Sequence, residues 1–279
     1  MRHRTLGHTG LIVSEVALGS MQFGGQMNMG NLGQEETNRM VKLALDHGIN
    51  FIDTADVYSL GESETLLGTA LKGIRQEIVL ATKVRLPMGE NFNRSGATRV
   101  NILREIEGSL GRLQTDYIDL YQVHGWDSNT PLEETLRTLD DLVRQGKVRH
   151  IGLSNLMSWQ AATAVMLQER LGLEKYVTAQ MYYSLVGRGL EHEFQSFAEL
   201  PRHRHPGLEP AGRRVPGGQV QPRQSSARRD PLCGRGSVRA LRPRDGLSRR
   251  GCAEGSGRAA WRQPGACRDR MGAQSARRQ

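Results

Sequence analysis

Short apolar runs alternate with amphipathic segments along the first 200 residues. The apolar runs have the length and composition of buried strands and lie at residues 14–21, 50–58, 77–84, 117–126, 148–155 and 177–185. Helical periodicity is found between them, at residues 35–48, 62–73, 99–114, 131–147 and 158–172, and a further helix begins within 191–200. Strict alternation of this kind predicts a mostly parallel sheet with helices outside it.

The order of these elements favours one α/β architecture. No glycine fingerprint follows the first strand, which disfavours a doubly wound dinucleotide-binding fold and favours a (β/α)₈ TIM barrel. Such a barrel closes with eight strands, whereas the pattern supplies about six βα units. The prediction is therefore an α/β fold in which residues 1–200 form a truncated TIM-barrel domain.

Local signals place several helix boundaries. We expect the first helix to end at Gly48, Pro131 to occupy a first helical turn, and Ser158 to cap the helix that it opens. In the helix at 99–114, apolar positions recur on one face and predict its buried side. They are Val100, Ile102, Leu103, Ile106 and Leu110.

Four residues that can carry proton chemistry lie near the carboxyl ends of predicted strands: Asp53, Tyr58, Lys83 and His124. In a parallel barrel these strand ends face one mouth. An ammonium lowers the pKa of a neighbouring phenol, a carboxylate holds the ammonium, and an imidazole orients a carbonyl, so the tyrosine becomes a general acid. Each residue alone is compatible with packing, and the ordered set is what predicts a catalytic site.

Several segments together resemble a known family. They are LGHTGLIVSEVALGSMQFGG, DTADVYSLGESETLLGTAL, VLATKV, DYIDLYQVHGWD and GKVRHIGLSN, within residues 4–200. In order and spacing they are similar to the aldo-keto reductases, specifically the bacterial branch that resembles the potassium-channel β subunits. The resemblance implies an NADPH-dependent reductase of aldehydes or ketones on a TIM barrel.

The resemblance also implies roles for single residues. The catalytic tetrad is matched by Asp53, Tyr58, Lys83 and His124. Cofactor contacts are matched by Gly19, Ser20, Met21, Asp53, Ser154, Asn155 and Gln180, and substrate contacts by Tyr58, His124 and Trp126. Simpler interpretations stay open: GLSN as a strand leading to a capped helix, Gly19 as a turn glycine, and Trp126 as packing at a barrel rim.

Composition changes sharply after residue 200. Residues 1–200 carry 19 Lys and Arg against 24 Asp and Glu. Residues 201–279 carry 19 Arg against five acidic residues and contain no Lys, Ile, Phe, Tyr, Asn or Thr. A segment without these apolar side chains lacks the material for a core, so residues 201–279 are predicted to be disordered.

The tail has the composition of a GC-rich gene translated out of frame. Permitted codons for residues 202–214, read from the second base, can give GIGTLVWSPLAGG, which resembles the family's seventh strand. We therefore interpret 201–279 as a frameshifted tail, with a genuine arginine-rich extension as the alternative. In the family, an aromatic of the seventh strand stacks on the nicotinamide and a basic loop after the eighth strand holds the 2′-phosphate. Because both are missing, the chain as written is expected to bind NADPH weakly if at all.

The remaining features narrow the functional classes. The N-terminal segment MRHRTLGHTG is polar, and no apolar run approaches the roughly 20 residues of a membrane span, so we expect a cytoplasmic protein without membrane association. Cys233, Cys252 and Cys267 match no common metal-site spacing, and no metal is expected.

The expected partner is a small carbonyl substrate. The arginines of the tail could bind phosphates non-specifically, but Trp261 is the only aromatic there, so no specific nucleic-acid partner is predicted. The alternatives to an enzyme are a non-catalytic NADPH-binding regulatory subunit and the inactive product of a frameshifted gene.

Overall fold

The computed structural model describes residues 1–198 and 209–210. The chain divides into two compact units, residues 1–223 and 224–279, and every described residue belongs to the first. The predicted disorder and frameshift of residues 201–279 therefore lie outside the described residues, apart from the two at 209–210.

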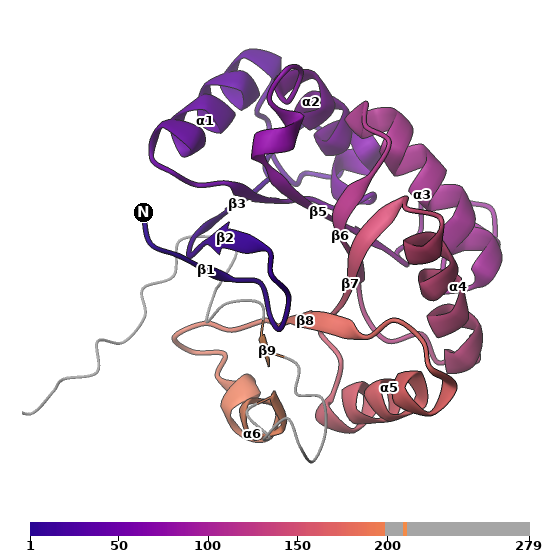
Figure 1. Ribbon diagram of the computed structural model, residues 1–279. Helices are drawn as coiled ribbons and strands as arrows, with labels where there is room; N and C mark the ends of the chain where they lie inside the picture. The colour runs from indigo at the N-terminus through magenta and orange to yellow at the C-terminus, as the bar shows by residue number, and fades with distance from the viewer. Residues whose placement is uncertain (199–208, 211–279) are drawn as a thin grey trace, which may run out of the picture. The chain divides into compact units, whose positions relative to one another are not determined.

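Seven parallel strands form one sheet in the order in which they occur along the chain (Figure 1). They are β3 (Ala17–Gly19), β4 (Phe51–Asp53), β5 (Val79–Val84), β6 (Ile118–Val123), β7 (Val148–Ser154), β8 (Tyr176–Gln180) and β9 (Glu209–Pro210). The first six correspond to the six predicted runs. The two-residue β9 extends the sheet one strand further than expected, by pairing with Thr178 and Ala179 of β8.

Helices connect consecutive strands and lie on the outer side of the curved sheet (Figure 1). They are α1 (Gln34–Asp46), α2 (Glu62–Ala70), α3 (Arg99–Leu113), α4 (Leu132–Arg144) and α5 (Ser158–Leu171), with α6 (Phe194–Ala198) after β8. Three short 3₁₀ helices occur at η1 (Tyr58–Gly61), η2 (Arg75–Glu77) and η3 (Gly189–Glu191). This arrangement is the predicted α/β fold, an incomplete (β/α)₈ barrel.

An antiparallel hairpin that the apolar pattern did not predict precedes the sheet. It consists of β1 (His3–Thr5) and β2 (Ile12–Ser14). Leu6 and Val13 of this segment are buried against the inward side chains Phe51 and Val79, which lie at the starts of β4 and β5. The hairpin therefore covers the amino-terminal ends of these strands and leaves their carboxyl ends for the site.

The helix boundaries follow the local signals in part. After α1, Gly48 has φ +76°, and the N–H of Ile49 donates to the carbonyl of Ala44 at 2.8 Å, which is the expected glycine termination. The capping prediction for Ser158 is wrong, because Ser158 is the first helical residue of α5 and its buried hydroxyl has no hydrogen-bond partner among the described residues. The N-terminal N–H there, that of Met157, is satisfied by the Gln160 side chain at 2.9 Å.

The main core lies between the sheet and the helices. All six residues of β5 and all six of β6 are buried, as expected for parallel strands covered on both faces. In α3, Ile102 and Ile106 are fully buried as predicted, whereas Val100 is 57% exposed, so its assignment to the buried face was wrong. At about 100° per residue, position 100 lies roughly 160° around the helix axis from Ile102 and roughly 120° from Ile106, so Val100 is on the side of α3 that faces away from the core.

Candidate active site

The four predicted chemical residues meet at the carboxyl edge of the sheet. Asp53 ends β4, Lys83 is the penultimate residue of β5, and His124 directly follows β6. Because adjacent strands are parallel and in register, these positions fall at one edge. Tyr58 returns to the same edge as the first residue of η1.

Lys83 is the centre of this group. Its side chain is 1% exposed, and Nζ donates to Oδ2 of Asp53 at 2.7 Å and to the hydroxyl of Tyr58 at 3.2 Å. The third N–H of the ammonium donates to the carbonyl of Thr54 at 2.8 Å. Every donor of the buried ammonium is therefore satisfied, and one of them is aimed at the phenol oxygen.

Charge balance keeps this ammonium protonated. Burial is the largest influence and would lower the pKa of Lys83, but the Asp53 carboxylate and the Tyr58 oxygen outweigh it, so the pKa is raised. The other oxygen of Asp53, Oδ1, accepts a hydrogen bond from Nε2 of Gln122 at 3.3 Å. Lys83 and Asp53 thus form a buried ion pair with no net charge, and the ammonium of this pair also donates to the Tyr58 hydroxyl.

His124 is a neutral imidazole at the mouth of the group. Burial, followed by the charges of Lys83 and Arg85, lowers its pKa to about 3. Its ring lies edge-on to the Tyr58 ring, with 6.0 Å between centroids and an interplanar angle of 76°. Its Nδ1 is buried without a hydrogen-bond partner among the described residues. A neutral imidazole can hydrogen-bond a carbonyl oxygen without competing as an acid.

A strained turn holds Tyr58 in place. Ser59 and Leu60 have φ values of +49° and +52°, and Gly61 follows at +90°. The hydroxyl of Ser59 is buried and donates to the carbonyl of Phe23 at 3.2 Å. Left-handed conformations at non-glycine residues cost free energy and occur where the surroundings fix them, so the direction of the tyrosine is set by the fold.

The residues matched to cofactor contacts occupy the same edge on both sides of the tetrad. On one side, Gly19 pairs in register with Asp53, Ser20 is buried with its hydroxyl accepting from Ser63 at 2.9 Å, and Met21 is 47% exposed. On the other side, Ser154 ends β7 opposite Gln180, which ends β8. These placements agree with the resemblance, and the binding roles remain predictions.

Asn155 is the residue that organises the β7 end of this edge. Its φ is +53°, its Nδ2 donates to the Ser154 hydroxyl at 3.2 Å, and its Oδ1 accepts from the N–H of Tyr182 at 2.8 Å. The carboxamide of Gln180, by contrast, makes no hydrogen bond among the described residues. Within the described residues, the Gln180 carboxamide is therefore the side-chain amide at this end without a protein partner.

Trp126 is partly buried against the core and also faces a second tryptophan. Its ring lies 5.7 Å from the ring of Trp159, at an interplanar angle of 60°. Trp159 is 58% exposed in the first turn of α5. Packing and substrate contact are both compatible with this position, so the substrate role of Trp126 remains a prediction.

Sequence reasoning missed two residues of this edge. Gln122 lies on the same side of the sheet as Lys83, with which it is paired in register, and the period of two along β6 could have revealed it. Arg85 follows β5 directly and donates from Nη2 to the carbonyl of Trp126 at 2.7 Å. Its role depends on a backbone conformation that has no signature in the sequence.

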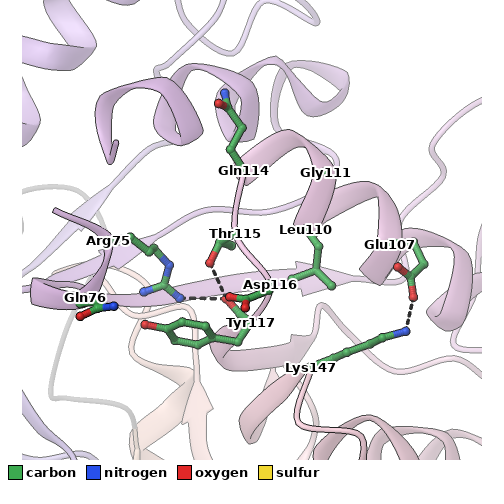
Figure 2. Close-up of a pocket in the computed structure, with 10 residues that line it drawn as sticks. All are labelled: Arg75, Gln76, Glu107, Leu110, Gly111, Gln114, Thr115, Asp116, Tyr117 and Lys147. Carbon is green, nitrogen blue, oxygen red and sulfur yellow. Dashed lines mark hydrogen bonds and ion pairs between the residues drawn. The ribbon is translucent and has the colours of Figure 1, made fainter. Parts of the chain in front are cut away.

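A surface cavity of about 820 Å³ lies at the opposite end of the sheet (Figure 2). Its lining comes largely from α3 and from the segments that precede β5, β6 and β7. Within it, Arg75 donates to the carbonyl of Tyr117 at 2.9 Å, and Lys147 pairs with Glu107. It is separate from the candidate site. No cluster of three or more metal-ligating side chains occurs among the described residues.

Comparison with known proteins decides the family. The sequence model of the Aldo/keto reductase family matches residues 15–200. The chain belongs to this family. It is 38% identical to the aldo-keto reductase YhdN of Bacillus subtilis, over 71% of this chain and 59% of the relative. It is 37% identical to versiconal hemiacetal acetate reductase of Aspergillus parasiticus, over 69% of this chain and 62% of the relative.

A further B. subtilis relative, the uncharacterized oxidoreductase YrpG, is 40% identical over 75% of this chain and 64% of its own length. The chain thus spans about three fifths of the length of these relatives. In the part of the chain that the structure describes, no helix has the length and apolar character that crossing a membrane requires.

Proposed function

We propose that the chain carries the catalytic half of an NADPH-dependent aldo-keto reductase that reduces an aldehyde or ketone to an alcohol. The observation that carries this proposal is the position of Lys83 Nζ, between Oδ2 of Asp53 at 2.7 Å and the hydroxyl of Tyr58 at 3.2 Å. Family membership supports reductase chemistry, and the tetrad geometry supports its proton-transfer step.

Tyr58 is proposed to act as the general acid. A bound reduced nicotinamide supplies the hydride to the carbonyl carbon. The electron pair of the C=O bond moves to the oxygen, and the Tyr58 hydroxyl gives that oxygen its proton, which leaves a phenolate. Lys83 stabilises the phenolate by charge, and Asp53 keeps the lysine in place. The neutral imidazole of His124 orients the carbonyl.

The residues at the carboxyl edge fit a nicotinamide carboxamide. Ser154, Asn155 and Gln180 supply a hydroxyl and two amides at adjoining strand ends, and the Gln180 amide makes no hydrogen bond within the described part of the chain. These residues would hold the carboxamide, with Gly19 and Ser20 on the other side. The preference for NADPH over NADH rests on the resemblance alone, and the loop expected to bind the 2′-phosphate falls outside the described residues.

The test is a pair of tyrosine variants, assayed in the chain as it is and in a version with the reading frame restored after residue 200. NADPH oxidation is followed with simple aldehydes, and NADPH binding is measured by fluorescence. In the frame-restored chain, Tyr58→Phe is expected to bind NADPH normally but to lose at least ~10²-fold in turnover, since only the proton donor is removed.

Tyr117→Phe is the matched control, because Tyr117 lies by the cavity at the opposite end of the sheet and its ring packs under Arg75 at 4.2 Å. Near-native turnover by Tyr58→Phe would refute the general-acid assignment. NADPH binding without turnover in the frame-restored chain would instead favour a regulatory cofactor-binding protein.

The out-of-frame interpretation of residues 201–279 is part of the proposal. It predicts that sequencing the gene across codons 195–205 reveals an additional base, and that the restored chain reduces aldehydes faster than the chain as written. A confirmed frame with equal activity of both chains would contradict it.

A further inference from the structure

Arg85 has the most unusual backbone conformation near the tetrad. Its φ is +128°, in a region that glycine favours and arginine rarely adopts. Bonds on both sides fix it: the carbonyl of Val84 accepts from the N–H of His124 at 2.9 Å, and the carbonyl of Arg85 accepts from the N–H of Gly96 at 2.8 Å. Strained backbone conformations cluster at functional sites, which suggests that the position of the Arg85 side chain matters for function.

The guanidinium of Arg85 reaches across to the segment that follows β6. Nη2 donates to the carbonyl of Trp126 at 2.7 Å, and Nη1 lies close to Gly125, where a methyl group on the Cα would be 3.9 Å away. This is the only hydrogen bond of the side chain among the described residues. The guanidinium is therefore held at the segment that follows His124, its charge acts on His124, and its remaining N–H groups make no hydrogen bond within the described residues.

Arg85 differs from Lys83 in having no carboxylate within ion-pair distance among the described residues. Lys83 and Asp53 neutralise each other at 2.7 Å, and His124 is neutral. Asp127, in the following loop, makes no direct ion pair with Arg85, although the Arg85 charge is one of the influences that lower the pKa of its carboxyl; its oxygens accept from the Thr130 hydroxyl at 2.6 Å and from the N–H groups of Ala97 and Asn129. Within the described residues, the Arg85 guanidinium therefore has no carboxylate in direct contact, and its charge acts on both His124 and Asp127.

Apolar side chains adjoin this charge. Ala55, Val57 and Met88 form a buried cluster, against which Leu86 and the Tyr58 ring pack. Leu86 is the residue after Arg85, and the backbone carbonyl of Trp126 accepts a hydrogen bond from the guanidinium. A ligand at this edge could contact the partly buried side chains of Leu86 and Tyr58, which rest on this buried cluster, together with the Arg85 cation.

We propose that Arg85 is a specificity-determining residue that binds a carboxylate on the carbonyl substrate, so that the site prefers anionic aldehydes or ketones with an apolar body. The assignment rests on the proposed reductase function. A guanidinium suits this task because it presents paired N–H donors to a carboxylate. The bond to the Trp126 carbonyl holds the side chain ready before the substrate arrives.

The test combines ligand binding by the chain as written with turnover and NADPH affinity in the frame-restored chain. Binding of benzoate and of the nearly isosteric neutral benzamide is measured by calorimetry. NADPH oxidation is compared between 4-carboxybenzaldehyde and the similarly shaped, neutral 4-nitrobenzaldehyde. The variants are Arg85→Gln, which keeps a donor for the Trp126 carbonyl, Arg85→Lys, which keeps the charge, and Arg149→Gln, which removes an exposed cation stacked on Tyr117 by the distant cavity.

We expect the unaltered chain and Arg149→Gln to bind benzoate at least ~10-fold more tightly than benzamide, Arg85→Lys to retain part of the preference, and Arg85→Gln to lose it. The carboxy-to-nitro ratio of kcat/KM should fall in parallel. An unchanged benzoate preference in Arg85→Gln, or a loss of NADPH affinity in that variant, overturns the assignment. Absence of turnover with both aldehydes, even with the frame restored, contradicts the proposed function, whereas the benzoate preference decides the role of Arg85 independently.

Discussion

Replacing Lys83 with methionine should destabilise the fold far more than an ordinary side-chain truncation. The variant leaves the Asp53 carboxylate, 4% exposed, with only the Gln122 amide at 3.3 Å as a side-chain partner. Removing one member of a buried ion pair costs about 3–5 kcal/mol, because an uncompensated charge remains in a low-dielectric site. Unfolding in urea, monitored by circular dichroism, measures this loss.

The double variant Lys83→Met/Asp53→Leu separates the charge effect from the loss of packing. Removing both partners eliminates the buried charge, so the double variant should be more stable than Lys83→Met alone by about 2 kcal/mol or more. A cost below about 1 kcal/mol for Lys83→Met, or a double variant less stable than the single one, would refute the description of a dry, mutually dependent pair.

The same pair predicts a pH dependence. The pKa of Lys83 is raised in the folded state, so the folded protein holds this proton more tightly than the unfolded chain does. The resulting stability is complete below the unfolded pKa of about 10.4 and is lost as pH rises through the folded value. Lys83→Met should lack this alkaline component of the stability profile.

Two further predictions concern other parts of the fold. The pKa of His124 is lowered to about 3, so the stability linked to its neutral form is present above the unfolded pKa of about 6.5 and is lost as pH falls toward 3. In His124→Gln, the free energy of unfolding in urea should therefore fall less steeply between pH 6.5 and about 3. An unchanged pH dependence would count against a buried neutral imidazole. Gly68→Ala would bring a methyl group within 2.4 Å of the Arg112 carbonyl oxygen and should cost about 1–3 kcal/mol. Gly111→Ala, where nothing lies within 4 Å, should stabilise α3 by about 1 kcal/mol, and thermal unfolding that ranks the two glycine variants the other way would contradict the α2–α3 packing.

Periodicity along the chain was enough to predict the alternating architecture. Each predicted strand run overlaps a strand of the sheet, because strands covered on both faces are continuously apolar and stand out between amphipathic helices. The same reasoning placed Asp53, Lys83 and His124 at one edge, since parallel strands must present their carboxyl ends together. These features could be predicted because the local sequence pattern and the global fold favour the same arrangement.

Other features have no local signature. The β1–β2 hairpin is only three residues per strand and β1 is exposed, so no apolar period marks it, and it forms because Leu6 and Val13 cover the starts of β4 and β5. Ser158 was predicted to cap α5, but Ser158 is already helical and Met157 is the N-cap residue. The backbone N–H of Met157 donates to the side chain of Gln160. Helix ends depend on packing within a few ångströms, which residue type alone does not specify.

The chemistry of the site was likewise predictable in part from the sequence and in part only from the structure. The sequence by itself determined which groups are available: a tyrosine, a lysine, a carboxylate and a histidine in a fixed order near strand ends. Only the tertiary structure decided their state. Burial makes His124 neutral, the 2.7 Å pair keeps Lys83 charged, and a backbone strained to φ +128° directs Arg85 to the Trp126 carbonyl. These properties arise from residues distant in sequence, whose proximity exists only once the sheet has curved and the strands have aligned.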